Sequence, residues 1–267
     1  MNRTRALQST QAKFLLADLI NKSATYIKEV GTYIEQHDGR PDDIHFVEID
    51  INYPQNILTF NDKPVIELGN IGSFDESGVV LTSYIKKDNE IWFYYSGFPR
   101  TAKMIFQSYT GLAISTDGGI TAKKKFKGPI VGLSKEEPFW SAGPRVFNNN
   151  DHFLLYYTSS DGWKEFKNEI VHYYNIKIMK SIDGVNWSFV NTAIDYKNDY
   201  EYAIAIPSII KGDNCWYMWY TYRAQEFINS YRIGYAESKD GEKWIRKDDE
   251  VGINVSEDGW DSEMICF

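Results

Sequence analysis

Three runs of consecutive aromatic and aliphatic residues dominate the hydrophobic pattern of the chain. They are Ile91–Tyr95, Phe153–Tyr157 and Trp216–Tyr220, and their last tyrosines lie 62 and 63 residues apart. Short apolar runs rich in aromatic residues are typical of buried β-strands. The near-constant spacing therefore predicts a structural unit of roughly 60 residues that recurs along the chain.

A second repeated element follows each aromatic run, a strand-like segment that ends in Ser-x-Asp-Gly. Its copies place the serine at Ser115, Ser181 and Ser238, and two of them carry a tryptophan three residues after the glycine, Trp187 and Trp244. An Asp-Gly pair between apolar runs supplies the positive φ angles of a tight turn, and the serine hydroxyl can bond backbone groups of that turn. We therefore predict a β-hairpin in each unit.

A third element opens each unit. Its copies are Phe74–Val80, Trp140–Val146, Tyr202–Ser208 and Trp260–Ile265. Four strands in each period of about 60 residues form the pattern of a propeller blade, whose neighbours bury one another's faces. The sequence thus predicts an all-β fold, a five-bladed β-propeller with four-stranded antiparallel blades, in which the opening strand is innermost and the last blade is incomplete.

The whole chain is predicted to be a single propeller domain, 1–267. The blades cover approximately residues 5–60, 70–132, 136–197, 199–255 and, in part, 257–267. The first blade is degenerate, with strands expected at Lys13–Ile20, Ala24–Glu29, Thr32–Gln36 and Ile44–Ile51 before a turn at Asn52–Asn56. A helix over Gln11–Asn21 is the competing interpretation, because the residues there also suit helical spacing.

The incomplete last blade would leave unpaired strand edges, which proteins avoid. A truncation, a rearranged terminus or another chain could account for the gap, and self-association at this blade is one expectation.

The amino-acid composition adds little to the fold prediction, but it limits the classes of molecule that the protein is expected to bind. The net charge is −8 and no basic stripe is visible, so no nucleic-acid partner is expected.

The location and the cofactors are also constrained by composition. Two cysteines, Cys215 and Cys266, fit a reducing compartment, and neither a clear signal sequence nor a membrane-length apolar run is present. A soluble, cytoplasmic protein with no membrane association is the expectation. The four histidines lack metal-ligand spacing, and no phosphate-cradling glycine loop occurs, so we predict neither a metal nor a cofactor.

Long connections after the aromatic strands, Ser96–Tyr109, Ser159–Asn175 and Thr221–Tyr231, are predicted to share one face of the propeller with the starts of the inner strands. Long loops on a rigid scaffold commonly carry function. Aromatic faces there suit sugar rings, and arginines and carboxylates suit hydroxyl or anionic groups. Ordinary solvated loops are the alternative. The residues assigned to substrate binding are Glu76, Arg145, Trp163, His172, Tyr222, Arg223, Arg232 and Trp260.

Four segments resemble bacterial five-bladed propeller proteins related to glycosidases. They are Phe74–Val79, Tyr220–Arg223, Tyr231–Ser238 and Gly259–Ile265. The wider superfamily contains arabinanases, β-xylosidases, invertases, levansucrases and mannoside phosphorylases, and the nearest resemblance is to predicted bacterial members associated with surface-polysaccharide gene clusters. The resemblance runs from about Phe46 to Phe267 and implies a carbohydrate substrate without naming a reaction.

The resemblance also implies catalytic carboxylates at the starts of the inner strands. The matching positions are Asp75 (or its neighbour Glu76), Glu201, Asp261 and Glu263. Glycoside cleavage needs one protonated and one ionised carboxyl group across the scissile bond. Two departures from the family pattern stand out. No acidic residue precedes Asp18, where arabinanase-like members place a first-blade aspartate, and Ile206 stands in Ala-Ile-Pro where relatives read Ala-Arg-Pro.

Each of these carboxylates also has a structural interpretation, as a turn cap or a loop residue. The leading hypothesis is a carbohydrate-active enzyme that hydrolyses or transfers a glycosyl unit. A glycan-binding propeller without catalysis and a protein-binding scaffold are the alternatives that the sequence leaves open.

Overall fold

The computed structural model describes residues 29–33, 43–49, 53, 57–102, 107–166, 169–224 and 230–266. These residues form β-strands, turns and one short 3-10 helix, so the predicted all-β class is confirmed. The strands predicted at Lys13–Ile20 and Ala24–Glu29 lie outside the described residues, Glu29 excepted, and so does the competing helix over Gln11–Asn21. Within the described ranges, no helix is both long and apolar enough to span a bilayer.

The chain divides into two compact units, Met1–Ile130 and Val131–Phe267. The first unit contains a three-stranded and a four-stranded sheet, both antiparallel. The strands of the three-stranded sheet are β1 (Glu29–Tyr33), β2 (Asp43–Ile49) and β3 (Ile57–Ile66), in that order. Those of the four-stranded sheet are β4 (Gly78–Lys87), β5 (Glu90–Phe98), β6 (Tyr109–Ser115) and β7 (Lys123–Lys124).

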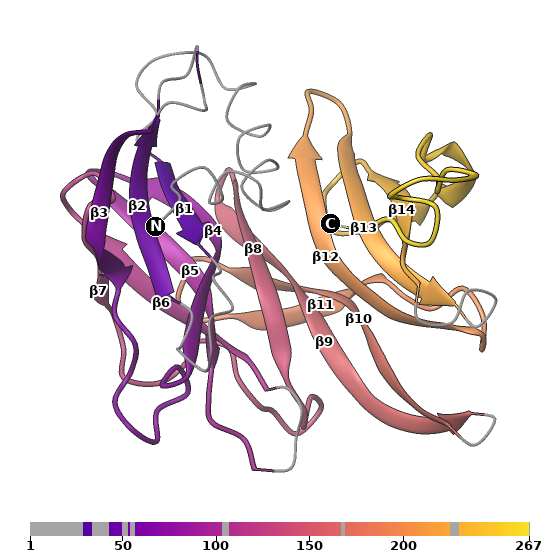
Figure 1. The fold of residues 1–267 in the computed structure, drawn as a ribbon, viewed down its shortest axis with the longest axis horizontal. Helices are drawn as coiled ribbons and strands as arrows, with labels where there is room; N and C mark the ends of the chain where they lie inside the picture. Colours follow the sequence, from indigo (N-terminus) through magenta and orange to yellow (C-terminus); the bar gives the residue numbers. More distant parts are fainter. Residues whose placement is uncertain are drawn as a thin grey trace. The chain divides into compact units, whose positions relative to one another are not determined.

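The second unit contains two four-stranded antiparallel sheets, each again in sequence order (Figure 1). The first consists of β8 (Ser141–Asn149), β9 (His152–Phe166), β10 (Glu169–Ser181) and β11 (Ser188–Ile194). The second consists of β12 (Glu201–Lys211), β13 (Trp216–Ala224), β14 (Arg232–Ser238) and β15 (Ile245–Arg246), followed by the 3-10 helix η3 (Asp248–Glu250). Four-stranded antiparallel sheets in sequence order are what the repeat predicted.

Each unit has its own apolar core. In the first, Ile44 and Phe46 of β2 pack with Val79 and Leu81 of β4 and with Phe93. In the second, the two sheets bury one face of each against the other; the largest members of that core are Leu154, Tyr156, Ile178, Trp216, Met218 and Tyr220. The alternation along β13 places Trp216, Met218 and Tyr220 on this buried face, as a period of two requires.

The Ser-x-Asp-Gly elements form the predicted turns. They connect β6 to β7, β10 to β11 and β14 to β15. The serine hydroxyl donates to the aspartate at 2.8 to 3.1 Å in all three. It also accepts a backbone N–H of the turn at 2.9 Å in each. The glycines have φ of 77°, 78° and 79°, which only glycine adopts without strain.

Strand β3 was not predicted, because Asn61–Pro64 has the composition of a turn. The structure places these residues inside the strand, where the pairing of β3 with β2 shifts register between Phe60 and Pro64. Strand β3 lies at the edge of its sheet, and an edge strand tolerates proline because one side of its backbone needs no partner. Of the strand predicted at Thr32–Gln36, Thr32 and Tyr33 lie in β1, and the remaining positions lie outside the described residues.

The strand predicted at Trp260–Ile265, which would open the fifth blade, is not present. Residues 251–266 contain no strand. Gly259, with φ of 106°, begins a turn in which its carbonyl accepts the Ser262 hydroxyl at 2.9 Å. Trp260 is 95% exposed. The backbone N–H of Ile265 bonds to the Tyr231 carbonyl at 3.2 Å, so this segment is held by the residue that precedes β14 rather than by a sheet of its own.

Candidate functional site

The long hairpin of β9 and β10 carries a group of aromatic side chains near its tip. Trp163 of β9 lies directly opposite His172 of β10, and their rings stack with centroids 4.1 Å apart and planes 11° apart. The His172 ring also meets Trp140 at 5.3 Å and Tyr174 at 5.0 Å, both edge-on. Opposite positions of an antiparallel pair share a face, as do residues two apart on one strand. We call Trp140, Trp163, His172, Tyr174 and Tyr231 the ring cluster.

A bulge in β9 allows this arrangement. Between Tyr173 and Tyr174 the pairing with β9 shifts by one residue, so that Asp161 has no partner in the ladder. Gly162 follows with φ of 93°, and a Cβ there would lie 2.8 Å from the Phe139 ring. Phe139 in turn meets the Trp163 ring edge-on at 5.7 Å. A glycine is therefore required both for the backbone angle and for the approach of the ring that supports Trp163.

His172 is neutral at physiological pH. Burial lowers the pKa of its imidazole to about 4, and its Nε2 lies 2.9 Å from the Ser160 hydroxyl. A neutral imidazole offers a flat face for stacking together with one donor and one acceptor nitrogen. Trp163 is 37% exposed, so the stacked pair presents part of a flat aromatic surface to solvent.

The ring cluster continues from His172 to the sheet β12–β15. The Tyr174 hydroxyl lies 2.7 Å from the Tyr231 hydroxyl, and burial raises the pKa of the Tyr174 phenol. The guanidinium carbon of Arg223 lies 4.0 Å from the centroid of the Tyr231 ring. The structure thus brings together three residues that the sequence assigned to substrate binding, Trp163, His172 and Arg223.

Two further predicted residues lie beside Tyr231. Arg232 Nη1 donates to the carbonyl oxygens of Tyr231 at 2.9 Å and of Glu263 at 3.2 Å. The Ser230 hydroxyl also donates to the Glu263 carbonyl. Glu263 uses its backbone in these contacts and its side chain is exposed. Asp261, which was also predicted to be catalytic, is half-buried, and its carboxylate accepts a hydrogen bond of 3.0 Å from the Ser256 hydroxyl.

Asp75, predicted to be catalytic, is 2% exposed. Its carboxylate accepts hydrogen bonds from the Ser73 and Tyr95 hydroxyls, each at 2.9 Å, and forms an ion pair of 2.6 Å with Lys124. Glu76 accepts the backbone N–H groups of Gly72 at 2.5 Å and Arg100 at 3.2 Å. Both acidic side chains are occupied by bonds that hold the segment before β4.

Glu201, also predicted to be catalytic, is 3% exposed and forms a bidentate ion pair with Arg246. The two oxygen–nitrogen distances are 2.6 and 2.8 Å. Arg246 also donates to Asp248 at 2.7 and 3.2 Å and to the Asp195 carbonyl at 2.8 Å, so all five of its N–H groups have acceptors. Tyr222, assigned to substrate binding, lies with its ring 5.7 Å from this guanidinium.

An ion pair between an acidic residue and a lysine or arginine recurs in three sheets and was not predicted from the sequence; we call it the carboxylate tie. An acidic residue stands 19 or 20 positions before the last tyrosine of each aromatic run and is bound to a cation of its own sheet. The ion pairs are Asp75–Lys124, Glu137–Lys177 at 3.2 Å and Glu201–Arg246. Tyr95 and Tyr157 donate directly to their carboxylates, whereas Tyr220 donates to Asp248. The constant spacing was the available signal.

Arg145 and Trp260, the remaining residues assigned to substrate binding, have other surroundings. Arg145 Nε donates to the Pro207 carbonyl of β12 at 3.3 Å and so links the two inner strands of the second unit. The exposed ring of Trp260 lies in the turn at 259–262.

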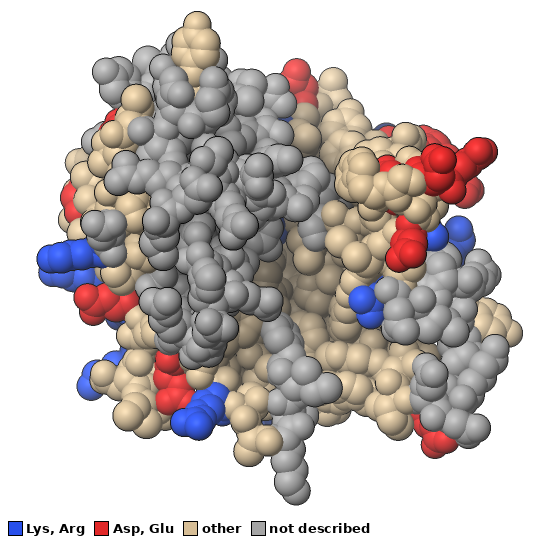
Figure 2. All heavy atoms as spheres, viewed as in Figure 1, with Lys and Arg blue, Asp and Glu red and all other residues tan. Residues whose placement is uncertain are grey.

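On the face drawn in Figure 2, side chains of both charge signs occur, and acidic ones gather over the C-terminal part of the protein.

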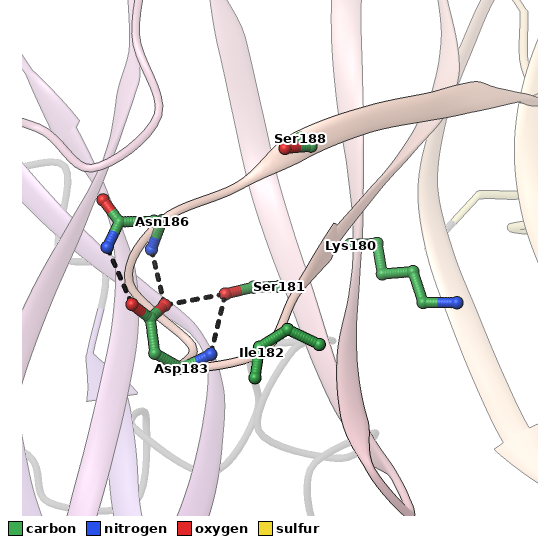
Figure 3. Close-up of a pocket in the computed structure, with 6 residues that line it drawn as sticks. All are labelled: Lys180, Ser181, Ile182, Asp183, Asn186 and Ser188. Atoms are coloured by element: carbon green, nitrogen blue, oxygen red, sulfur yellow. Dashed lines mark hydrogen bonds between the residues drawn. The ribbon is translucent and has the colours of Figure 1, made fainter.

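An open depression of about 350 Å³ lies at the turn between β10 and β11 (Figure 3). Its lining residues all come from this single turn and its flanks, Lys180–Asp183, Asn186 and Ser188. The Asp183 carboxylate is bonded by backbone N–H groups of Val185 and Asn186, both at 2.8 Å. His172 is nine residues from Ser181 along β10, roughly 30 Å in an extended strand. The depression is therefore a feature of the turn and separate from the ring cluster.

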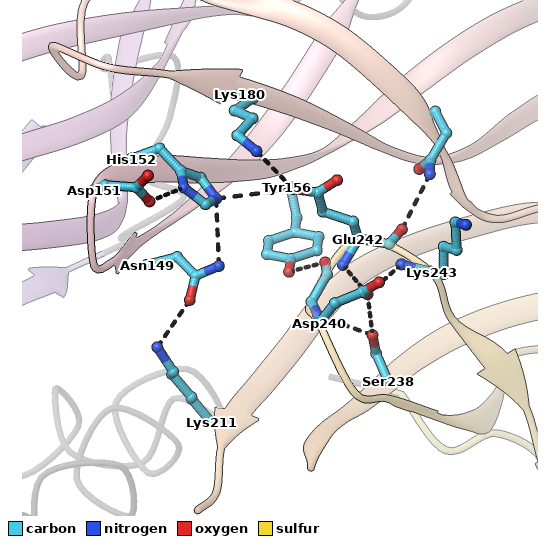
Figure 4. Close-up of polar contacts among 12 residues, drawn as sticks. Asn149, Asp151, His152, Tyr156, Lys180, Lys211, Ser238, Asp240, Glu242 and Lys243 are labelled. Carbon is cyan, nitrogen blue, oxygen red and sulfur yellow. Dashed lines mark hydrogen bonds and ion pairs between the residues drawn. The ribbon is translucent and has the colours of Figure 1, made fainter. Parts of the chain in front are cut away.

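Polar contacts at the same end of β10 join the two sheets of the second unit (Figure 4). Glu242 accepts Lys180 Nζ at 2.9 Å, and Asn191 donates to the Glu242 carbonyl at 3.1 Å. The Tyr156 hydroxyl donates to the Gly241 carbonyl at 2.5 Å. These contacts stabilise the packing of the sheets. Among the described residues, no three potential metal-ligating side chains gather into a group that could hold an ion.

The chain is similar to two curated proteins of Mycobacterium tuberculosis, "Uncharacterized protein MT1551" and "Uncharacterized protein Rv1502". Each is 30% identical over 237 residues, which cover 88% of this chain and 77% of the relative. No protein-family model matches the chain.

Solved structures with a similar fold include glycoside hydrolases. One described as "Glycoside hydrolase" has a TM-score of 0.64 at 14% identity, over 89% of this chain and 73% of that one. The Penicillium chrysogenum α-L-arabinanase, complexed with arabinobiose, has a TM-score of 0.54 at 14% identity, over 81% of this chain and 62% of that one. These similarities show that the fold is of the β-propeller type found in glycosidases.

Proposed function

The chain belongs to the same family as the mycobacterial proteins Rv1502 and MT1551, and from its glycosidase-type propeller fold we propose that it is a carbohydrate-active protein. We propose the ring cluster as the place where a sugar binds. The observation that carries this proposal is the stacked pair of Trp163 and His172, which is partly open to solvent near the tip of β9 and β10.

The chemistry of the ring cluster suits a sugar. The C–H face of a pyranose or furanose ring packs on flat aromatic side chains, and its hydroxyl groups need donors and acceptors at the edge of that surface. Neutral His172 contributes both a flat face and polar nitrogens, and Arg223 contributes N–H donors next to the Tyr231 ring. His172 comes from β10 and Arg223 from β13, and Tyr231 directly precedes β14.

Hydrolysis or transfer of a glycosyl unit is the finer proposal. It requires two carboxyl groups at the scissile bond. Asp75 and Glu201 are buried and ion-paired, and proton exchange with a substrate would require those pairs to break. Asp261 and Glu263 are more open to solvent, and Glu263 lies beside Arg232 at the edge of the ring cluster. We therefore assign the catalytic role to Asp261 and Glu263.

Glycan binding without turnover is the second candidate function. The burial and complete pairing of Asp75 and Glu201 favour it, because these two residues occupy the inner-strand positions at which the superfamily resemblance places catalytic groups. In that case the carboxylate ties serve the fold, and the ring cluster alone serves function.

Binding to a panel of oligosaccharides, measured by calorimetry, tests the proposal. Trp163→Ala should weaken the affinity for the saccharide that binds by about tenfold, because stacking on an exposed ring contributes about 1.5 kcal/mol. Phe189→Ala is the matched control, since Phe189 is also an exposed aromatic residue of the second unit but lies on β11. It should leave the affinity unchanged.

Turnover of the bound saccharide separates the two candidates. Release of a reducing sugar by the wild-type protein that is lost in Asp261→Asn or Glu263→Gln supports hydrolysis by these residues. Tight binding with no product supports the binding function. If no saccharide binds, or if Trp163→Ala binds as tightly as the wild type, the carbohydrate site is not at the ring cluster.

A further inference from the structure

Arg223 differs from Arg246, another partly buried arginine of its sheet. Arg246 has an acceptor for each of its five N–H groups and pairs with two carboxylates. Arg223 stacks on the Tyr231 ring, and its Nε is buried without a hydrogen-bond acceptor. No carboxylate of the described chain forms an ion pair with it. A buried N–H group without an acceptor costs about 1 to 3 kcal/mol, so the sheet keeps a cation here at an energetic disadvantage.

Among the described residues, two titratable groups whose pKa the Arg223 charge acts to lower do not neutralise that charge. One is the Cys266 thiol, whose pKa is raised by burial although the nearby Arg223 charge opposes that shift. The other is the Tyr174 phenol, whose pKa is raised by burial and by the adjacent Tyr231 hydroxyl. Both groups are therefore uncharged at neutral pH, and the positive charge of Arg223 has no counter-ion in them.

A second arginine, Arg232, lies beside Tyr231 and donates from Nη1 to the carbonyl oxygens of Tyr231 and Glu263. Arg223 is stacked on the last ring of the ring cluster. A guanidinium binds planar or tetrahedral anions through pairs of parallel N–H donors, and stacking on an aromatic ring holds it in a fixed plane for that purpose.

We propose that the sugar recognised at the ring cluster carries an anionic substituent, a carboxylate or a phosphate, and that Arg223 binds this group. The inference rests on the proposed carbohydrate function and adds the class of the ligand. Successive contacts connect the stacked pair to the cation: His172 to Tyr174 at 5.0 Å, Tyr174 to Tyr231 at 2.7 Å, and Tyr231 to Arg223 at 4.0 Å. This row is longer than a single sugar ring, so the sugar unit that carries the acidic group is the one next to Tyr231 and Arg223.

Matched monosaccharides that differ only at C6 test the inference. The first series is methyl glucoside, methyl glucuronide and methyl glucoside 6-phosphate, and the second is the corresponding galactose series. Affinities are measured for the full chain by ligand-observed NMR. In at least one series we expect the wild-type protein to bind an anionic member at least about tenfold more tightly than the neutral one, a preference that 0.5 M NaCl reduces. Comparing the affinities of the uronide and the 6-phosphate shows whether a carboxylate or a phosphate is recognised.

Arg223→Gln should abolish this preference by weakening the affinity for the anionic member far more than the affinity for the neutral one, because glutamine keeps N–H donors but carries no charge. Arg223→Lys should retain part of the preference, and thermal melting confirms that both variants are folded.

Equal binding of neutral and anionic members by the wild type would overturn the acidic-ligand inference and leave the carbohydrate function standing. A preference that persists in folded Arg223→Gln would equally overturn the role of Arg223. Failure of every saccharide, including the neutral ones and the oligosaccharide panel, would overturn the function itself.

Discussion

Ile206 has a φ of 52°, although it is β-branched and lies in the inner strand β12. The equivalent residue of β8 is Gly143, with φ of 64°, and each is followed by a proline. Positive φ strains a side chain with a Cβ by about 1 to 2 kcal/mol and does not strain glycine. We therefore expect Ile206→Gly to be about 1 kcal/mol more stable than Ile206→Ala in urea unfolding.

Ile210, four residues later on β12 and similarly exposed, is the matched control. It lacks a positive φ, so the order should invert, with the glycine variant less stable than the alanine variant by about 0.5 to 1 kcal/mol. The same order of the two variants at both positions would show that the backbone at Ile206 is not strained. Strained backbone positions cluster at functional sites, so Ile206 is also a candidate for a functional position.

At the scale of the element, the tight turn between β14 and β15 is also a packing surface. A Cβ at Gly241 would lie 3.1 Å from Leu154, Trp216 and Tyr156, whereas a Cβ at Gly118 in the turn after β6 would meet nothing within 4 Å. Both glycines have φ near 78°. Gly118→Ala should therefore cost about 1 kcal/mol from the backbone alone, and Gly241→Ala should cost more, because neighbouring side chains must also move.

Urea unfolding of the two variants measures these losses. Equal losses of unfolding free energy at Gly241 and Gly118 would mean that the β14–β15 turn is not closely packed against the neighbouring sheet. The comparison emphasises packing, since both hairpins have the Ser-x-Asp-Gly sequence, a serine hydroxyl that accepts a backbone N–H of the turn, and the same φ at the substituted glycine.

For the whole molecule, His172 and Asp183 are among the groups whose lowered pKa predicts a loss of stability in acid. Burial lowers the pKa of His172 to about 4, so between pH 6.5 and 4 the unfolded chain binds a proton that the folded protein does not. Backbone N–H bonds from Asn186 and Val185 lower the pKa of Asp183, so its contribution is present above about pH 4 and is lost as the pH falls further. The melting temperature should thus fall in two successive windows.

Two variants assign the windows. His172→Gln should flatten the decline between pH 6.5 and 4, and Asp183→Asn should flatten the decline below pH 4. An NMR titration of the His172 ring should give a midpoint near 4. A midpoint near 6.5 would contradict the buried, neutral imidazole on which the stacked pair depends.

Much of the architecture was determined by the sequence itself. The period of the aromatic runs and the Ser-x-Asp-Gly turns predicted four-stranded antiparallel sheets, because strand alternation and positive-φ glycines are local properties of the chain. The prediction was wrong at Trp260–Ile265 and missed β3, because strand formation there depends on which neighbours are available for pairing.

The site was decided mainly by tertiary structure. The predicted strand pattern placed Trp163, His172 and Arg223 on long connections, whereas they lie within β9, β10 and β13. Their convergence depends on the bulge before Tyr174 and on the packing of two sheets. The carboxylates Asp75 and Glu201 looked catalytic from their position in the chain, whereas their ion pairs with Lys124 and Arg246 were visible only in space. The reason is physical. A strand encodes its own alternation, but the environment of a charge is set by residues far away in the sequence.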